Sequence, residues 1–484
     1  MAREIRLNTM TAPVLPSVVH QVLDLPADRL AAVIGTWPEP AILASGPGFG
    51  EAGRWSIYAA YPRLVFEAMD RRWRIGGESG ALQTGAGDPL IELVRLARRF
   101  ELADSADAAD PDACPFQGGM IGFLGYDLAP LLERLPRRMP RDSRLPDLRF
   151  ALYDTAVTVD NRTGEAVLHA WDLTGEGREA AERRGRFWRR AIRSSLRSPR
   201  PIRTSELGPL ASNFDQVSYL ERVRRALEYI AAGDAFQINL SQRFAAHGTI
   251  EPLDLFLRLA AASPAPFSAF MSWRDLAIVS ASPELFYQTK GRSVVTRPIK
   301  GTRPRSADAA VDQRLAAELT RSAKDRAELT MIVDLERNDL GRVCRYGTVR
   351  VIDPLAVESF AQVHHLVATV EGRLRGEIGP DDVIRAVFPG GSVTGAPKIR
   401  AMEIIDELEP TRRSLYTGAI GYLCRGGASG FNIAIRTMTV EGNRVSYQLG
   451  GGIVADSHPQ GEYEETLHKG RGLRAVIERK DVFS

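Results

Sequence analysis

Residues 417–449 read TGAIGYLCRGGASGFNIAIRTMTVEGNRVSYQL, and this stretch indicates the class of fold. It contains apolar, alternating segments at 417–423, 432–440 and 444–449, which we predict to be strands. The connections between these segments are too short for a crossover helix, so the strands should follow one another as a meander. A meander favours an antiparallel or mixed sheet over a purely parallel one.

The same kind of segment recurs along the chain and alternates irregularly with helical patterns. We predict further strands at 55–60, 63–67, 151–159, 236–240, 277–280 and 293–296. Helical spacing of apolar residues predicts helices at 89–100, 177–194, 217–230, 309–338 (two helices), 381–387, 397–408 and 459–478. The glycine-rich stretch 118–126 lacks a G-x-G-x-x-G turn, so close backbone packing explains it better than a dinucleotide site. The fold class is therefore α+β.

The composition is that of a large globular protein. The chain has 484 residues, of which 44% are hydrophobic and 25% are charged. The net charge of +3 is too small for this length to imply binding to nucleic acid or to a membrane through the overall field. We therefore expect neither as a partner.

The cysteines and the distribution of apolar residues bear on the compartment. The 3 cysteines are widely spaced and form no C-x-x-C pair, which supports neither a disulfide framework nor a structural zinc site. We see no signal segment before His20 and no run of about 18 apolar residues. The expected location is the cytoplasm.

An arginine-rich segment divides the chain. Arginines crowd into residues 183–203, and the Ser198-Pro199-Arg200-Pro201 sequence ends this stretch. A solvated helix followed by a linker is favoured over a nucleic-acid arm, because few aromatic residues accompany the arginines. We predict an N-terminal α+β region at 1–205 and a second region at 206–484.

Acidic residues in the second region suggest a cation site. Glu328 lies at helical spacing from Met331, Ile332 and Leu335, so its carboxylate should lie on an inward stripe. An unpaired buried carboxylate is costly, so Glu328 needs either a cation or an internal salt bridge, with Arg337 or Arg342 as candidates. Both readings stay open on spacing alone.

A second acidic group opens the last predicted helix. Glu462, Glu464 and Glu465 follow the glycines at 450–452. Acidic residues in a first turn usually just complement the helix dipole. Here the flexible strand end could also hold an anion through its N–H groups. Two glutamates facing one cavity make a plausible hard-cation site, and Mg²⁺ often uses one or two protein carboxylates together with substrate oxygens.

Three further sites carry polar groups in unusual surroundings. Residues 388–398 read FPGGSVTGAPK and lead into a helix, a setting that suits an anion but is no Walker A loop. Arg436 lies in an otherwise apolar predicted strand, where it is either an ion-pair partner or a carboxylate receptor. Lys300 lies between Pro298 and Pro304, and a neighbouring metal or arginine could lower its pKa enough to make it a nucleophile.

Together these motifs resemble the chorismate-utilising enzymes, and within them the component I subunits of anthranilate synthase and aminodeoxychorismate synthase. The resemblance covers nearly the whole chain and rests on 334–340 (DLERNDL), 395–398 (GAPK) and 456–466 (DSHPQGEYEET). It implies a large two-layered antiparallel or mixed β-sandwich core flanked by helices, with 206–484 as the chorismate-binding catalytic region. Anthranilate synthases typically read P-I-A-G-T where this chain reads Pro-Ile-Lys-Gly-Thr at 298–302, which looks like aminodeoxychorismate synthase.

The resemblance also implies roles for individual residues. Lys300 would be the nucleophile, Glu284 the general acid and base, and His365 a group near the substrate ring that positions it. Without the resemblance, we would interpret Glu284 as a glutamate in a surface turn and His365 as an isolated histidine in the core. Mg²⁺ would be held by Glu328 and Glu465, supported by Glu462 and Asp325. The remaining expected substrate contacts are Thr302, Ser392, Tyr416, Arg436, Gly451, Gly452 and Lys469.

The expected substrates are chorismate and ammonia, and the expected product is 4-amino-4-deoxychorismate, on the route to p-aminobenzoate and folate. No cysteine lies in a G-x-C-x-G elbow, so ammonia should come from a separate glutamine amidotransferase subunit. The alternatives are an anthranilate synthase component I, an isochorismate or salicylate synthase, or a catalytically silent chorismate-binding subunit.

Overall fold

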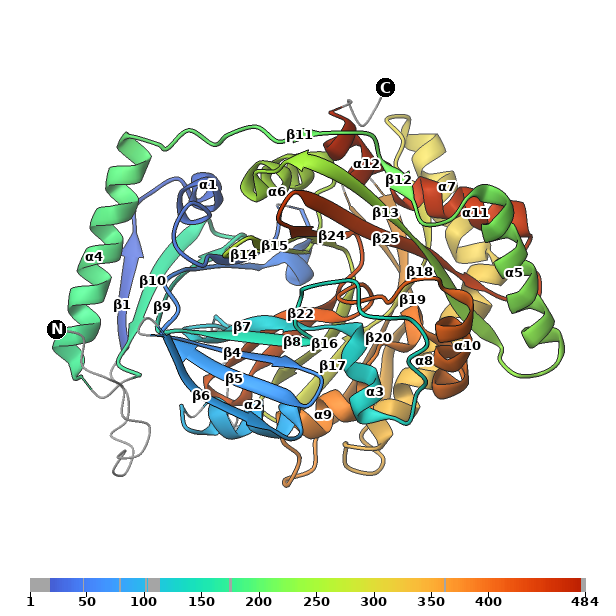
Figure 1. Cartoon of the computed structure of the whole chain (residues 1–484), viewed down its shortest axis with the longest axis horizontal. Helices are drawn as coiled ribbons and strands as arrows, with labels where there is room; N and C mark the ends of the chain where they lie inside the picture. Colours follow the sequence, from blue (N-terminus) through green and yellow to red (C-terminus); the bar gives the residue numbers. More distant parts are fainter. Residues whose placement is uncertain are drawn as a thin grey trace.

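Two large β-sheets lie face to face, and helices cover their outer surfaces (Figure 1). This computed structural model describes residues 18–46, 48–77, 80–100, 102, 114–173, 176–360 and 363–479. The segment before residue 18, on which most of the signal-peptide prediction rests, lies outside the described residues. Within the described residues, every strand pairing is antiparallel, so the antiparallel alternative is confirmed over the mixed one.

The first sheet has 13 strands within the described part of the chain. Its main path runs, in spatial order, through β1 (Val18–Leu23), β10 (Glu165–Trp171), β9 (Thr155–Asp160), β3 (Trp55–Ala59), β2 (Ala41–Ala44), β14 (Phe267–Trp273), β15 (Leu276–Ser282), β24 (Thr437–Glu441), β25 (Arg444–Ile453), β13 (Gln237–Thr249) and β11 (Glu206–Leu207). The short strands β12 (Ala211–Ser212) and β21 (Gly395–Ala396) also pair with β13.

The second sheet has 12 strands within the same residues. Its path runs through β18 (Ile299–Pro304), β20 (Val363–Arg373), β17 (Ser293–Arg297), β16 (Leu285–Lys290), β23 (Ser429–Ile433), β22 (Ala419–Cys424), β7 (Gly119–Leu124), β8 (Leu148–Tyr153), β4 (Leu64–Met69), β5 (Arg72–Gly77) and β6 (Gly80–Ala86), and β19 (Arg350–Ser359) pairs with β20. Both sheets take strands from both sides of residue 205, so the predicted domain boundary there does not coincide with the division between the two sheets. The two domains, 1–205 and 206–484, stay a prediction.

The helices form three groups around the sheets. Against the outer face of the first sheet lie α1 (Leu30–Ile34), α4 (Arg178–Arg197), α6 (Pro252–Ala262) and α12 (Arg471–Glu478). Against the second sheet lie α2 (Pro89–Arg98), α7 (Ala309–Arg321), α8 (Ala323–Gly341) and α9 (Pro380–Val387). The end of the first sheet at β13 and β25 is covered by α5 (Gln216–Ala231), α10 (Lys398–Leu408) and α11 (Pro459–Lys469), and α3 (Ala129–Leu132) lies in the loop after β7.

Apolar residues from the facing surfaces of both sheets form the central layer of the core, among them Phe123, Tyr153, Met271 and Ile278. The glycine-rich segment 118–126 contributes β7 to this region. An ideal Cβ built on Gly122 would lie 1.9 Å from the backbone oxygen of Arg149 on β8. The predicted close backbone packing is confirmed, because a side chain there would separate two paired strands.

Three predicted elements each divide into two in the structure. The single strand predicted at 432–440 is two strands, β23 and β24, which belong to different sheets. Likewise, the strand predicted at 151–159 divides at Asp154 into β8 and β9, again in different sheets. The helix predicted at 459–478 divides at Gly470 into α11 and α12. In the two strand cases one continuous apolar pattern spans a change from one sheet to the other, because both halves are buried.

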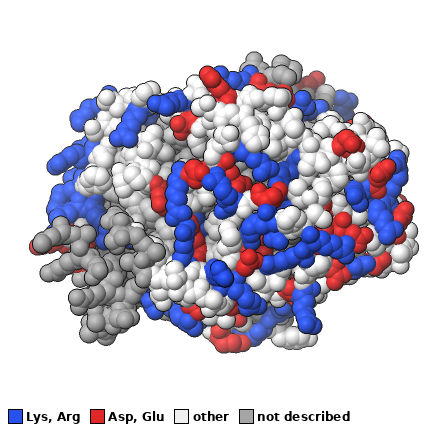
Figure 2. Space-filling view, viewed as in Figure 1, with Lys and Arg blue, Asp and Glu red and all other residues white. Residues whose placement is uncertain are grey.

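The arginine-rich segment forms the predicted helix, α4, followed by an extended linker (Figure 1). Trp188 and Ile192 face the core, while arginines such as Arg183 and Arg186 are exposed and pair with Glu179 and Glu182 one turn away. Figure 2 shows basic side chains at the end of the molecule where α4 lies. The reading as a solvated helix is confirmed. None of the described helices is both long enough and apolar enough to cross a membrane.

Candidate active site

The candidate site begins on β18, where the strand is irregular. Its pairing with β20 shifts register between Lys300 and Thr302, and Gly301 between them has φ +71°. The Lys300 amine donates a 3.4 Å hydrogen bond to the backbone oxygen of Ser392. Burial lowers the pKa of Lys300, although the charge of Glu328 opposes this change. A lysine with a lowered pKa holds more of the neutral, nucleophilic amine.

Glu284 lies next to this lysine, in the connection between β15 and β16. Only 4% of the residue is exposed. The Ser392 hydroxyl donates a 2.7 Å hydrogen bond to Glu284 Oε1. Burial raises the pKa of Glu284, while the serine hydroxyl and the Lys300 charge act in the opposite direction. The structure thus joins two sequence-predicted catalytic residues through Ser392, and Glu284 is not the surface residue of the alternative reading.

His365 lies on β20 opposite Thr302, and 3% of it is exposed. Its Nδ1 and Thr302 Oγ1 are 2.9 Å apart and share a hydrogen bond. Burial and the nearby charge of Arg436 lower the pKa of His365 to about 3. The imidazole is therefore neutral near pH 7, so it can position groups by hydrogen bonding without carrying a positive charge.

The predicted metal carboxylates come from two helices. Glu328 on α8 has 16% of its side chain exposed, and its ion-pair partner is Lys324 at 3.8 Å. Arg337 instead pairs with Asp334, and Arg342 donates to the backbone oxygen of Ala386, so neither alternative salt bridge to Glu328 forms. Burial raises the pKa of Glu328, and the charge of Glu465 adds to this shift. The two carboxylates therefore repel each other across the site.

On α11, Glu465 pairs with Lys469 at 2.7 Å, and Glu462 accepts a 2.6 Å hydrogen bond from Ser457. Burial acts to raise the pKa of Glu465, but the charges of Lys469, Lys324 and Lys300 together outweigh it and the pKa is lowered. For Glu462, burial raises the pKa. Asp325 is held by Arg303 at 3.2 Å.

A cation would relieve the repulsion between these carboxylates, so the residues fit a Mg²⁺ site that is completed by substrate oxygens. Among the described residues, no group of three or more His, Cys, Asp or Glu side chains is arranged to hold a metal ion. The Mg²⁺ assignment stays a prediction.

The glycines at the end of β25 border these groups. An ideal Cβ on Gly451 would lie 2.9 Å from Glu462 Oε2, and one on Gly450 would lie 3.0 Å from the Tyr416 hydroxyl. The Lys469 amine donates a 3.1 Å hydrogen bond to the Gly450 oxygen. Side chains would fill this space, so glycine leaves the backbone of β25 accessible between α11 and Tyr416. Burial raises the pKa of Tyr416 to about 12, which keeps its hydroxyl a hydrogen-bond donor.

Arg436 is not in a strand, contrary to the prediction. It lies where the chain passes from β23 to β24, with φ +49°. Its side chain makes no ion pair with any of the described residues, and burial lowers its pKa. A half-buried guanidinium without a partner acid can receive a carboxylate of a ligand. The reading as a carboxylate receptor is therefore favoured over an internal ion pair.

Two residues of the motifs at 334–340 and 395–398 have structural partners instead. Lys398 donates 2.7 Å and 2.9 Å hydrogen bonds to Asp339 and to the Val387 oxygen, so it ties α10 to α8. Glu336 contacts Thr296, and burial raises its pKa to about 8.

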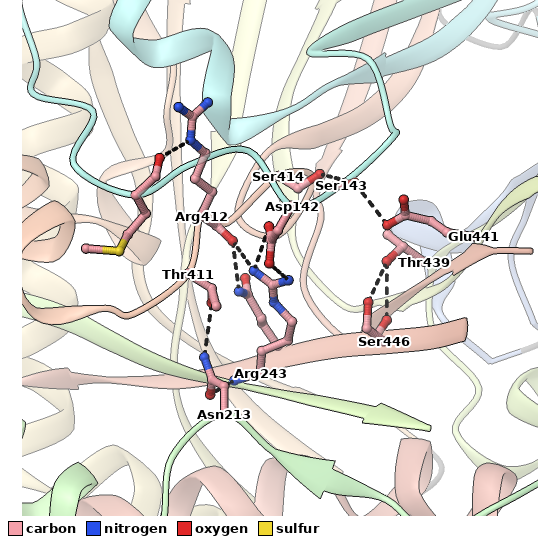
Figure 3. A network of polar contacts seen from close by, with 12 residues as sticks. Asp142, Ser143, Asn213, Arg243, Thr411, Arg412, Ser414, Thr439, Glu441 and Ser446 are labelled. Atoms are coloured by element: carbon pink, nitrogen blue, oxygen red, sulfur yellow. Dashed lines mark hydrogen bonds and ion pairs between the residues drawn. The ribbon is translucent and has the colours of Figure 1, made fainter. Parts of the chain in front are cut away.

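Sequence reasoning missed the segment 409–414, which follows α10. Arg413 forms a buried ion pair with Glu409 at 2.7 Å. Figure 3 shows part of this segment, where the Arg412 backbone oxygen accepts a 2.7 Å hydrogen bond from Arg243, which also pairs with Asp142. The sequence offered one signal for a buried arginine here, the Arg412-Arg413 pair. Two adjacent arginines are equally typical of a solvated turn, so the pair did not identify Arg413.

Comparisons with known proteins agree with this geometry. The chain matches the chorismate binding enzyme family over residues 61–475. It is 45% identical to aminodeoxychorismate synthase component 1 of Salmonella typhimurium, across 92% of this chain and 94% of that protein. It is 42% identical to anthranilate synthase component 1 of Thermus thermophilus, across 90% of this chain and 91% of that protein.

Solved structures show the same fold. Anthranilate synthase component I from Streptococcus pneumoniae superimposes with a TM-score of 0.75 at 34% identity, covering 89% of this chain and 93% of that one. MenF, the menaquinone-specific isochorismate synthase from Escherichia coli, has a TM-score of 0.72 at 18% identity, covering 96% of this chain and 94% of that one. At this identity the likeness concerns the fold and not the activity. The antiparallel two-sheet architecture predicted from the resemblance is confirmed. The chain belongs to the chorismate binding enzyme family and is a chorismate-utilising enzyme.

Proposed function

We propose that the chain is an aminodeoxychorismate synthase component 1, which converts chorismate and ammonia to 4-amino-4-deoxychorismate and water through a covalent intermediate on Lys300. The observation that carries the proposal is the arrangement of Lys300, Ser392 and Glu284. Lys300, whose pKa is lowered, and the buried Glu284, whose pKa is raised, are both hydrogen-bonded to Ser392. A nucleophile and an acid are the two groups that replacement of a poor leaving group requires.

In the first displacement, the neutral Lys300 amine bonds to ring carbon C2. The ring double bonds shift toward C4, and the C4 hydroxyl leaves as water with a proton from Glu284. In the second displacement, ammonia bonds to C4, the double bonds return, and the C2–nitrogen bond to Lys300 breaks. Glu284 takes one proton from the new ammonium group, so both residues regain their starting protonation states.

The other predicted residues would hold the substrate. Arg436 would pair with the enolpyruvyl carboxylate, with Tyr416 and the N–H groups of Gly451 and Gly452 beside it. The neutral His365 would position the ring together with Thr302. Glu328 and Glu465, with Glu462 and Asp325 behind them, would hold Mg²⁺, which when bound supplies positive charge for the ring carboxylate. Lys469 would exchange its contact with Glu465 for the substrate.

Ammonia would come from a separate glutamine amidotransferase subunit. Support comes from the sequence, which offers no cysteine in a glutaminase elbow, and from relatives that are named as component 1 of a synthase. Cys344 and Cys424 are buried, and Cys114 is partly buried. A cytoplasmic location accords with the wide spacing of the cysteines in the sequence and stays a prediction.

The second candidate is an anthranilate synthase component 1, in which ammonia enters at C2 and pyruvate leaves. The identity to the Thermus thermophilus protein and the likeness to the Streptococcus pneumoniae structure favour it. Lys300 argues against it, because an amine in that position would occupy the path of ammonia to C2. A silent chorismate-binding subunit is disfavoured by the presence of Lys300, Glu284 and Glu328 together.

The deciding experiment incubates the purified chain with chorismate, Mg²⁺ and ammonium, and separates the products. We expect 4-amino-4-deoxychorismate without release of pyruvate. Anthranilate and pyruvate as the main products would refute the proposal. Replacing ammonium by glutamine should stop turnover until an amidotransferase subunit is added, and glutamine-dependent turnover by the chain alone would refute the separate subunit.

A further inference from the structure

Arg413 lies in the loop after α10, and 1% of its side chain is exposed. The guanidinium group has five N–H donors, and all of them are used. Its Nε and Nη2 donate 3.0 Å and 2.7 Å hydrogen bonds to the two carboxylate oxygens of Glu409. Glu409 Oε1 also accepts hydrogen bonds of 2.9 Å and 2.8 Å from the backbone N–H and hydroxyl of Ser241. The ion pair is therefore fully satisfied and anchored to β13.

The other hydrogen bonds of Arg413 go to parts of the chain that carry predicted site residues. Nη1 donates 3.0 Å and 3.2 Å bonds to the Val393 oxygen and to Thr417 Oγ1. Nη2 donates a 2.5 Å bond to the Asn239 oxygen on β13. Val393 follows Ser392, and Thr417 follows Tyr416. One rigid side chain thus sets the relative positions of three segments that are distant in the sequence.

Aromatic contacts fix the plane of the group. The guanidinium carbon lies 4.9 Å from the centre of the Tyr126 ring and 5.5 Å from that of the Tyr416 ring. Since Tyr416 borders Gly450, Arg413 supports a wall of the candidate substrate site from behind. The contact with Val393 supports the turn in which Ser392 binds both Glu284 and Lys300.

We infer that Arg413 is a positioning residue for the reaction at Lys300 and Glu284, acting through the Val393 carbonyl and Tyr416, an inference that rests on the proposed function. A buried ion pair contributes little net stability compared with well-packed apolar residues. Its contribution here is to geometry, because the planar fork of arginine holds its acceptors in fixed directions, which a lysine cannot do. A misplacement of about 1 Å at a reacting group can slow a reaction by about 100-fold.

The test compares Arg413→Lys with Arg412→Lys as the matched control. The Arg412 side chain donates one described hydrogen bond, to the Met139 oxygen, and makes no described contact with Val393 or Glu409 (Figure 3). Chorismate consumption is followed with saturating ammonium. We expect Arg413→Lys to lower kcat by about 100-fold while KM for chorismate stays within about threefold, and Arg412→Lys to change neither by more than about threefold.

A second variant separates positioning from stability. Arg413→Met combined with Glu409→Met replaces the ion pair by apolar side chains, which should preserve folding but leave the Val393 and Asn239 carbonyls without their donor. We expect a folded protein that unfolds cooperatively, with a midpoint lowered by the unpaired carbonyls, and the same loss of kcat. A stable double variant with kcat near that of the wild type would overturn the inference. So would a rise in KM with kcat intact, or loss of folding in both variants.

Chorismate consumption does not depend on which product forms. If the wild-type chain releases anthranilate, the proposed function fails, but the comparison between Arg413 and Arg412 variants still decides the positioning role.

Discussion

The Ser392 hydroxyl donates a 2.7 Å hydrogen bond to Glu284, two residues on segments more than a hundred positions apart. The backbone oxygen of the same serine accepts a hydrogen bond from Lys300. A side-chain substitution at Ser392 can therefore remove the contact to the acid while leaving the contact to the nucleophile. This separation makes Ser392 the most informative position for dissecting the proposed mechanism.

Replacing Ser392 by Ala should raise the pKa of Glu284 further, because burial raises it and the serine hydroxyl opposes that shift. If Glu284 donates the proton to the leaving hydroxyl, the alkaline limb of kcat/KM moves to higher pH, and kcat falls by about tenfold or more because the acid is less well oriented. The measurement is the pH profile of chorismate consumption. Ser392→Thr keeps a hydroxyl and serves as the control. An unshifted alkaline limb in Ser392→Ala would show that the serine hydroxyl does not control the protonation of the catalytic acid.

Chorismate without ammonia should leave a mass increase on the peptide that contains Lys300, because the second displacement lacks its attacking amine. Lys300→Ala should abolish the adduct, as observed by mass spectrometry after rapid quenching. Lys324→Ala, which alters the amine 3.8 Å from Glu328, should keep it. Absence of a wild-type adduct would contradict the covalent mechanism but not the identity of the product.

Glu328→Gln and Glu465→Gln should each raise the Mg²⁺ concentration needed for half-maximal activity by on the order of 10- to 100-fold, because each removes an anionic oxygen from a hard-cation site. The measurement is a Mg²⁺ titration of activity, with thermal unfolding as the check on folding. Glu464→Gln changes a neighbouring glutamate that accepts a hydrogen bond from Gln460 and should leave the titration unchanged. Equal titrations for all the variants would exclude Glu328 and Glu465 as metal ligands.

His169 should make folding sensitive to acid. Its Nδ1 lies 2.8 Å from His20 Nδ1, and its Nε2 lies 2.7 Å from Thr158 Oγ1. Burial lowers its pKa from 6.5 to about 3, so the unfolded chain binds more protons between these values and stability decreases as the pH falls through that window. The contribution is at most about 1.4 kcal/mol per pH unit.

Denaturant unfolding of His169→Asn between pH 7 and pH 4 should show a shallower loss of stability on acidification than the wild type. His365, with its pKa also lowered to about 3, contributes in the same direction and remains in both proteins. The exposed His247 offers the matched substitution, His247→Asn, which should not alter the slope. Equal slopes for His169→Asn and the wild type would show that the buried His169 does not control acid stability.

The sequence by itself determined the class of the fold, the places of most of the long helices and the chemical groups available. Local signals suffice for these features, because a helix depends on contacts three or four residues apart and on its caps. The division of 309–338 into two helices is an example: Ser322 lies between α7 and α8, and its hydroxyl accepts from the Asp325 N–H. The prolines at 298 and 304 likewise marked Lys300 without any knowledge of its neighbours.

Only the tertiary structure decided which of those groups meet. No local pattern indicates that β23 and β24 lie in different sheets, because both are buried and read as one apolar run; the crossing between them places Arg436 at the site. The hydrogen bonds of Arg413 to Val393 and Asn239, and the contact of Ser392 with Glu284, join residues that the tertiary packing brings together. Such contacts follow from burial and strand register over long separations, and a single sequence carries no periodic signal for them.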